Sequence, residues 1–131
     1  MNAMMKLAFV AAERATCSRL AVGAVLSRGP ILLAEGYNGA PVGHPHCVHD
    51  GTEEHCEIAV HAEVNAVLMA ARLGIPTVGA TLWATHVPCP RCAGLIVNAG
   101  IVRVVYHSFY KDDRGLGILW VGGVDSDWDN S

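Results

Sequence analysis

Hydrophobic residues follow two different patterns in the first part of the chain. In residues 1–15 they recur at helical spacing, which predicts an amphipathic helix. Two short hydrophobic runs, 20–26 and 31–36, flank Ser27-Arg28-Gly29-Pro30 and predict a β-hairpin. Residues 37–57 are rich in Gly, Pro and His and predict a long loop. Because such loops are uncommon within a compact domain, this one is expected to carry function or to bind something that orders it.

The second part of the chain alternates helical and strand patterns. Residues 64–73 predict a helix, because hydrophobic positions recur there every three or four residues. A strand over 80–86, a helix over 90–99 with Pro90 in its first position, and a strand over 101–106 follow. An initial hairpin followed by alternating helices and strands predicts one α/β domain, a three-layer α/β/α arrangement with a central mixed sheet spanning residues 1–131.

The C-terminal tail beyond Lys111 gives a weaker signal. Its glycines disfavour a helix; they are Gly115, Gly117, Gly122 and Gly123. Residues 125–131 are acidic at several positions and predict a frayed end.

Composition and charge narrow the function. The chain has 131 residues, of which 52% are hydrophobic, so a sizeable core is expected. No hydrophobic run reaches the ~18 residues of a membrane span, and residues 1–15 lack the order of a signal peptide. Five cysteines without a secretion signal indicate a reducing, cytoplasmic compartment. A net charge of −3 with scattered basic residues argues against a polynucleotide partner.

Two short motifs carry candidate chemistry: His61-Ala62-Glu63 and Pro88-Cys89-Pro90-Arg91-Cys92. Two thiolates and one imidazole hold zinc with a fourth position open to water, whose pKa falls to ~7 from ~15.7. A carboxylate two residues from a ligating His can reach that water without binding the metal, so Glu63 is the candidate proton carrier. H-x-E followed by P-C-x-x-C is the known signature of zinc-dependent nucleobase deaminases, and this chain matches it.

The predicted helices strengthen the pairing of the two motifs. His61 and Glu63 are expected in the first turn of one helix, and Cys89 and Cys92 at the start of another. The positive end of each helix dipole favours thiolate over thiol. The alternative is a zinc-ribbon-like module in which the metal only stabilises the fold. Such a module does not need Glu63 and usually closes its fourth position with another Cys or His.

The order of these motifs resembles one family. The matching segments are 17–25 (C-S-R-L-A-V-G-A-V), 36–41 (G-Y-N-G-A-P), 55–56 (H-C), 61–66 (H-A-E-V-N-A) and 88–92 (P-C-P-R-C). Together they resemble the deoxycytidylate (dCMP) deaminases of the cytidine-deaminase-like superfamily, most closely the short bacterial and phage members. The resemblance implies hydrolysis of dCMP to dUMP and ammonia, which supplies dUMP for thymidylate synthesis. It also implies a homo-oligomer, with a hexamer favoured, activated by dCTP with Mg²⁺ and inhibited by dTTP.

The tail is expected to depart from the final helix and strand usual in that family, and the subunit contacts and regulation are expected to depend on this difference. Carried over residue by residue, the resemblance makes His61, Cys89 and Cys92 the ligands of the catalytic Zn²⁺ and Glu63 the proton shuttle. The candidate substrate-binding residues are Arg19, Asn38, Ala62, Tyr110 and Lys111. Asn38 has the alternative of a turn residue, and Arg19 and Lys111 that of solvated surface charges.

The remaining cysteines indicate a possible second zinc. Positions matching Cys17 and Cys47 are associated with a structural Zn²⁺ in part of the family, and His55 with Cys56 would complete the set. His44, His46 and His49 compete with His55 as the fourth ligand. The alternative is that these cysteines are ordinary core residues.

Other functions remain open at this stage. A deaminase of free cytidine, cytosine or guanine would use the same zinc chemistry with different pocket contacts. A polynucleotide deaminase would need basic and aromatic residues along a strand-binding channel, and this chain is acidic and only 6% aromatic. A non-catalytic zinc-stabilised binding module would keep the cysteines without needing Glu63.

Overall fold

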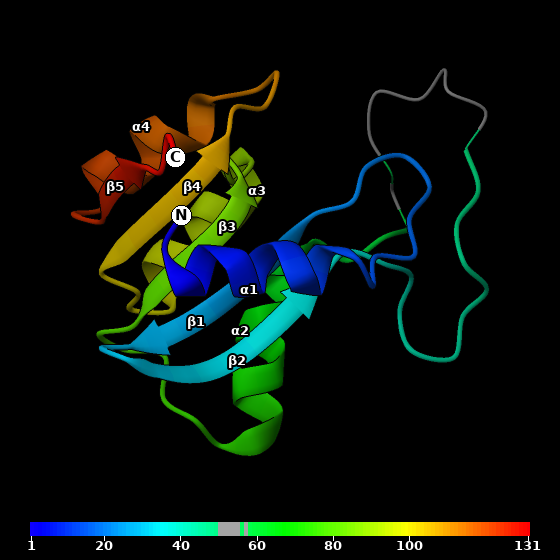
Figure 1. Ribbon diagram of the computed structural model, residues 1–131, viewed down its shortest axis with the longest axis horizontal. Coiled ribbons are helices and arrows are strands. Elements are labelled where there is room, and N and C mark those ends of the chain that lie inside the picture. The colour runs from blue at the N-terminus through cyan, green and yellow to red at the C-terminus, as the bar shows by residue number, and fades with distance from the viewer. Residues whose placement is uncertain (50–55, 57) are drawn as a thin grey trace.

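The described residues form a five-stranded mixed sheet with helices on both faces (Figure 1). The computed structural model describes residues 1–49, 56 and 58–131. In chain order the elements of this part are α1 (Ala3–Ala12), β1 (Gly23–Arg28), β2 (Ile31–Tyr37), α2 (Ala62–Leu73), β3 (Thr81–His86), α3 (Pro90–Asn98), β4 (Arg103–Ser108), α4 (Arg114–Val121) and β5 (Asp125–Trp128). The predicted three-layer α/β/α fold with a mixed sheet is confirmed.

The strand order places the C-terminal ends of the parallel strands at one edge of the sheet. The order is β2-β1-β3-β4-β5, with β1 antiparallel to both of its neighbours and β3, β4 and β5 parallel to one another. Because parallel strands end at the same edge of a sheet, the start of α3 and the residues after β4 lie close together there. Ligand sites in α/β folds commonly form at such an edge.

The helices form the two outer layers. Helix α1 covers one face, where Met5 and Ala8 pack with Val25, Trp83 and Val105. Helices α2, α3 and α4 cover the other face, over a core of small and branched residues from β1, β3 and β4. The backbone of α1 approaches β1 closely at Gly23, where any Cβ would overlap the carbonyl oxygen of Ala8.

Most predicted elements are confirmed, with shifted boundaries. The hairpin turn is shorter than predicted, because Ser27 and Arg28 still pair with β2 and only Gly29 (φ 56°) and Pro30 remain for the turn. Helix α2 begins at Ala62, so His61 is its N-cap. Strand β4 begins two residues later than predicted, at Arg103 instead of Ile101.

The predicted frayed tail was wrong. Residues 114–121 form α4, and 125–128 form β5, which pairs in parallel with β4. Leu119 is fully buried and Val124 is 5% exposed, so hydrophobic contacts compensate for the poor helix propensity of the glycines. The chain therefore has a final helix and strand, which corrects the expected departure from the family.

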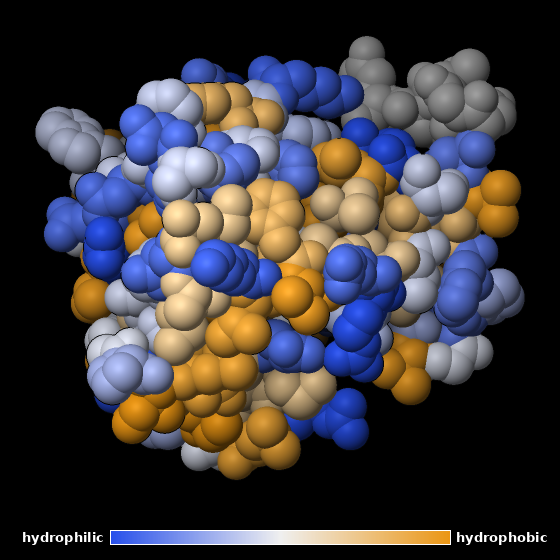
Figure 2. Space-filling model, viewed as in Figure 1, coloured by the Kyte–Doolittle hydropathy of each residue, from blue (hydrophilic) through white to orange (hydrophobic). Residues whose placement is uncertain are grey.

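Hydrophobic surface remains on the outside of the molecule. Figure 2 shows it gathered in the lower part of the view, where β2 and the end of α2 lie in Figure 1. The exposed hydrophobic residues of these elements include Ile31, Leu32 and Leu73. Among the described residues, no helix is both long and hydrophobic enough to span a membrane.

Candidate active site

The first side of the site is the N-terminus of α2. His61 has extended backbone angles as the N-cap, Ala62 is the first helical residue, and Glu63 lies in the first turn. The side chain of His61 makes no capping hydrogen bond to the helix, so its ring is available to other groups. Orphan N–H groups at a helix start favour negative charge nearby.

The second side is the N-terminus of α3. Cys89 is the N-cap, Pro90 occupies the first turn, and Cys92 follows within that turn. The two helix starts face each other. Nδ1 of His61 lies 3.3 Å from Sγ of Cys92 and 3.5 Å from Sγ of Cys89. The three ligand atoms all lie within 4.8 Å of one another.

This donor set fits zinc. Two thiols and one imidazole converge from helix ends, with no protein group among the described residues completing a fourth position in the group. A hydrogen bond from Cys92, opposed by burial and reinforced by His61, lowers the pKa of Cys89 to about 4. The same contact with Cys89, together with burial, raises the pKa of Cys92. Cys89 is therefore the more readily ionised of the two thiols, and a bound cation favours two thiolates.

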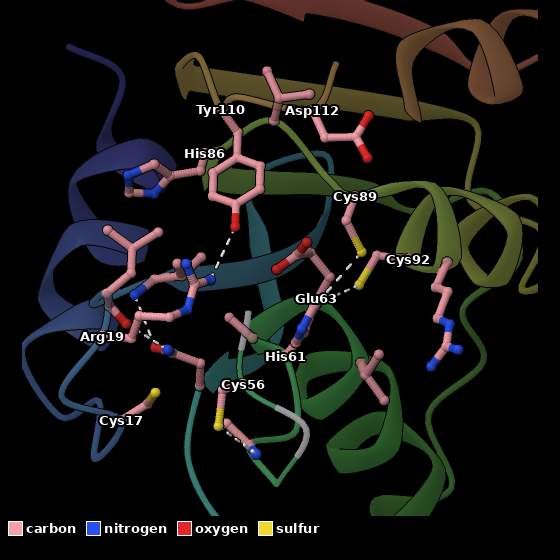
Figure 3. A pocket seen from close by; sticks show the side chains of 18 of the residues that line it. Cys17, Arg19, Cys56, His61, Glu63, His86, Cys89, Cys92, Tyr110 and Asp112 are labelled. Carbon is pink, nitrogen blue, oxygen red and sulfur yellow. Dashed lines mark hydrogen bonds between the residues drawn. The ribbon is translucent and has the colours of Figure 1, made fainter. Parts of the chain in front are cut away.

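Glu63 is buried beside the three ligands. Its side chain is directed into the pocket, next to Cys89 and Cys92 (Figure 3), and only 4% of the residue is exposed. Burial raises the pKa of its carboxyl, while a backbone hydrogen bond and the nearby His61 oppose that change. A carboxyl group whose pKa is raised in this way holds a proton more readily than an exposed one, which suits a proton carrier.

A cavity of about 870 Å³ opens in front of these residues. Its walls include every residue predicted to contact substrate, which are Arg19, Asn38, Ala62, Tyr110 and Lys111. Ala62 is fully buried. Because its side chain is a single methyl group, it contributes only backbone atoms and the Cβ to the wall. Lys111 is exposed at the rim. The structure therefore brings the predicted substrate residues and the three metal-binding residues into one place.

Two of the predicted substrate residues, Arg19 and Tyr110, contact each other across the cavity. Arg19 Nη2 donates to the hydroxyl of Tyr110 over 2.9 Å, and its guanidinium lies 6.0 Å from the centre of the Tyr110 ring (Figure 3). The contact connects the segment before β1 with the segment after β4. A cation is thus held at one end of the cavity, where it can meet an anionic group.

Asn38 uses both groups of its side-chain amide on the backbone. Its Oδ1 accepts from the Val22 N–H over 2.8 Å, and its Nδ2 donates to the Leu20 carbonyl over 2.5 Å. These bonds fix the segment that leads into β1, next to the cavity. Asn38 therefore shapes the wall, and its oxygen retains one lone pair for a ligand.

The sequence interpretation missed several cavity-lining residues: His86, Arg91, Asp112 and Arg114. Asp112 and Arg114 form an ion pair at 2.7 Å. Arg91 could have been noticed, because it lies between the two cysteines of the C-x-x-C motif. His86 and the Asp112–Arg114 pair carried no signal, because their place at the cavity follows from the ends of β3 and β4.

A second group of metal-binding side chains lies at the long loop. Cys17, Cys47, His49 and Cys56 place their ligand atoms within 4.8 Å of one another, with Cys17 Sγ 3.3 Å from Nε2 of His49. The predicted ligand His55 lies outside the described residues. His49 was one of the competing histidines, whereas the other two, His44 and His46, are exposed and do not belong to the described group.

The second group also fits a closed zinc site, because its three thiols and one imidazole are a complete tetrahedral set. Burial and the neighbouring Cys17 and Cys56 thiols raise the pKa of Cys47 to about 11. Burial also acts against ionisation of Cys56, yet N–H groups of Ala59 and Ile58 and the adjacent thiols lower its pKa to about 7. None of the chain's cysteines forms a disulfide.

The chain is similar to several known proteins. ComE operon protein 2 of Bacillus subtilis (strain 168) is 44% identical over 103 residues, which cover 76% of this chain and 54% of that protein. The chain thus spans about half the length of that relative. The deoxycytidylate deaminase of Mycobacterium phage D29 is 39% identical over 114 residues, covering 76% of this chain and 88% of the phage protein.

A solved structure matches over nearly the whole chain. The dCMP deaminase from the cyanophage S-TIM5, in complex with dCMP and dUMP, superimposes with a TM-score of 0.88 at 33% identity, covering 95% of this chain and 92% of that chain. The model of the cytidine and deoxycytidylate deaminase zinc-binding region matches residues 1–108, which include both motifs. The chain therefore belongs to the cytidine and deoxycytidylate deaminase family.

Proposed function

We propose that this protein is a zinc-dependent deaminase that hydrolyses dCMP to dUMP and ammonia. The observation that carries the proposal is the convergence of His61, Cys89 and Cys92 beside the buried Glu63, in a fold that matches a dCMP deaminase over 95% of this chain. The cavity is large enough for a nucleotide, since small-molecule sites typically range over ~300–1,000 Å³. The dUMP formed would supply thymidylate synthesis.

His61, Cys89 and Cys92 would hold the catalytic zinc. When bound there, zinc supplies a Lewis acid that brings the ionisation of water close to neutral pH. Glu63 takes the proton of the attacking water and delivers it to N3 of cytosine. The water oxygen bonds to C4. Glu63 then takes the second proton, from the new C4 hydroxyl, and gives it to the exocyclic nitrogen. The bond from C4 to that nitrogen breaks, ammonia leaves, and C4 becomes the carbonyl of uracil.

The remaining cavity residues would bind the nucleotide. Arg19, held by Tyr110, and Lys111 at the rim supply positive charge for the 5′-phosphate, and hydrogen bonds to an ionised phosphate are stronger than neutral ones. Asn38 offers its remaining lone pair to a sugar hydroxyl. Ala62 presents backbone to the base. The acidic chain and its discrete cavity favour a nucleotide over a polynucleotide.

The second group is proposed as a structural zinc site with Cys17, Cys47, His49 and Cys56 as ligands. Purified protein should then contain about two zinc ions per chain, because structural zinc binds with high affinity. His49→Ala should lower this to about one zinc and reduce thermal stability. His44→Ala is the matched control, since His44 is exposed and should leave both zinc ions in place. A zinc content near one in the wild type would reject the second site.

Assembly and regulation belong to the same proposal. The exposed hydrophobic surface over β2 and α2 supports a homo-oligomer (Figure 2), and the resemblance to the family favours a hexamer. Activation by dCTP with Mg²⁺ and inhibition by dTTP would follow if the family's regulation is retained, and the protein is expected to act in the cytoplasm. Sedimentation with and without dCTP and Mg²⁺ measures the assembly, and ammonia release with dCTP or dTTP added measures the regulation.

The substrate is tested by ammonia release from dCMP, CMP, deoxycytidine, dCTP and guanine. The proposal expects the highest kcat/KM for dCMP. A preference for deoxycytidine would move the protein to the nucleoside deaminases, and a preference for guanine to the base deaminases. No ammonia from any of them, with zinc bound, would favour a non-catalytic module.

A further inference from the structure

The second group of metal-binding residues borders the substrate cavity itself. Cys17 and Cys56 line the same cavity as His61, Cys89 and Cys92. Figure 3 shows Cys17 and Cys56 on the side of the pocket opposite Tyr110, below Arg19 and His61. Two of the four ligands of the second group therefore lie in the wall of the cavity that also contains the catalytic group. A metal bound at the second group would lie in the wall of the substrate pocket.

The second group of metal-binding residues lies close to Arg19, the residue proposed to bind the phosphate. Cys17 is followed directly by Ser18 and Arg19. The backbone N–H of His49 donates to Oγ of Ser18 over 3.2 Å, so the loop that carries His49 contacts the segment that carries Arg19. Arg19 in turn donates to Tyr110. Cys17 is thus two residues from Arg19 in the chain, and His49 contacts Ser18, the residue between them.

The group is also connected to the catalytic side. Cys56 precedes His61 by five residues, and its Sγ accepts from the Ala59 N–H over 3.3 Å. The intervening Val60 pairs with Gly39, exchanging backbone hydrogen bonds at 2.8 and 3.2 Å. Val60, directly before His61, is therefore held against Gly39, and Cys56 is hydrogen-bonded to Ala59 in the same segment.

We infer that Cys17, Cys47, His49 and Cys56 position the substrate pocket: when they hold a metal they fix Arg19, and thereby set the affinity for the phosphate end of the substrate. This inference rests on the proposed dCMP deaminase function. Without the metal, the four ligand side chains sample more conformations, and ordering them would cost free energy on substrate binding. A site that only stabilised the fold would leave substrate affinity unchanged.

Cys47→Ser in the full-length protein tests the inference. Cys47 is buried and does not line the described cavity, so an effect on substrate must pass through the other ligands. We expect one zinc fewer per chain, a KM for dCMP raised at least about tenfold, and a kcat within about threefold of wild type. The KM for deoxycytidine, which lacks the phosphate, should change less. His44→Ala is the control and should change none of these values.

Binding measured without turnover gives an independent readout. The Kd of dCMP can be measured by calorimetric titration in Glu63→Gln and in the double variant Glu63→Gln, Cys47→Ser. We expect the Kd to be higher in the double variant, by the same factor by which Cys47→Ser raises the KM. Loss of one zinc with unchanged dCMP affinity, measured well below the unfolding temperature, would overturn the inference.

If Cys47→Ser does not fold, Ser18→Ala replaces it. This variant keeps all four ligands and removes only the contact between Ser18 and His49. We expect the full zinc content and a several-fold weaker binding of dCMP; full zinc content with wild-type binding overturns the inference. The proposed function fails separately, if wild-type protein prefers deoxycytidine or guanine over dCMP.

Discussion

Arg19 and Tyr110, 91 residues apart in the sequence, meet across the cavity through a hydrogen bond of 2.9 Å. Arg19 belongs to the segment before β1, which the Asn38 amide fixes through Leu20 and Val22. Tyr110 belongs to the segment after β4. The contact holds a positive charge in the wall of the cavity that also contains the zinc-binding residues, where it can meet an anionic group of a ligand.

Lys111→Ala tests the positive charge at this end of the cavity. We expect wild-type protein to use dCMP at least about a hundredfold more efficiently than deoxycytidine, since two charge-assisted contacts contribute roughly 1.5–3 kcal/mol each and ~1.4 kcal/mol is tenfold. Lys111→Ala should narrow this ratio, mainly through a higher KM for dCMP. Steady-state kinetics on both substrates measure it.

Lys6→Ala is the matched control, because Lys6 is exposed on α1, outside the lining of the cavity. It should leave the ratio between the two substrates unchanged. Equal efficiency of wild-type protein on dCMP and deoxycytidine would show that the cavity does not recognise the phosphate.

Glu63→Gln tests the proton carrier. The amide keeps the shape of the side chain and leaves His61, Cys89 and Cys92 in place, but it cannot transfer a proton. Turnover should fall by at least the ~10²–10⁴-fold typical of a lost general acid/base, while zinc content and dCMP binding persist. Ammonia release, metal analysis and calorimetry measure these three quantities. Glu13 carries an exposed carboxyl at the end of α1, so Glu13→Gln is the control and should behave like wild type. Near-normal activity of Glu63→Gln would show that Glu63 is not the proton carrier.

The sequence predicted the site best where the metal-binding residues lie at the start of a helix. His61 and Cys89 are N-caps, and their helices were recognisable from hydrophobic spacing and from Pro90. The assignment of Arg19 and Tyr110 to one pocket depended on the resemblance, and their contact with each other was not predicted, because nothing local joins two segments so far apart. The histidine of the second metal group could not be chosen, since the path of a long loop decides which of several histidines meets Cys17.

The tail was the main failure, and its cause is tertiary. Glycine lowers helix propensity, so counting glycines predicted no helix. In the structure Gly115 is required by close packing, because a Cβ there would overlap the carbonyl oxygen of Pro88. Burial of Leu119 then stabilises the helix. Such contacts between segments distant in the sequence are invisible to local propensity.

His86 provides a pH-dependent prediction. Burial lowers its pKa from the ordinary value of 6.5, and the charge of nearby His107 lowers it further. The unfolded chain therefore binds more protons at this residue than the folded chain, and the free energy of unfolding should decrease as the pH falls through 6.5 towards the lower folded value. His86→Gln should lose this part of the pH dependence.

Denaturant unfolding of wild type and His86→Gln at about pH 5.5 and about pH 7.5, with zinc present throughout, measures the difference. His44→Gln is the control, because His44 is exposed. An unfolding free energy that changes equally with pH in wild type and His86→Gln would contradict the prediction.

Gly115 and Gly117 form a matched pair within α4. Substituting each in turn tests how α4 packs against the backbone of Pro88 and Cys89. A Cβ at Gly115 would overlap the backbone of Pro88, directly before Cys89, whereas a Cβ at Gly117 would meet nothing within 4 Å. Gly115→Ala should therefore destabilise the protein by about 1–3 kcal/mol, the usual cost of overpacking, and should lower activity by displacing Cys89. Gly117→Ala should stabilise it by roughly 0.8–1 kcal/mol through helix propensity and leave activity unchanged. Thermal unfolding and ammonia release on both variants measure the contrast, and equal effects of the two substitutions would show that α4 does not pack against Pro88 in solution.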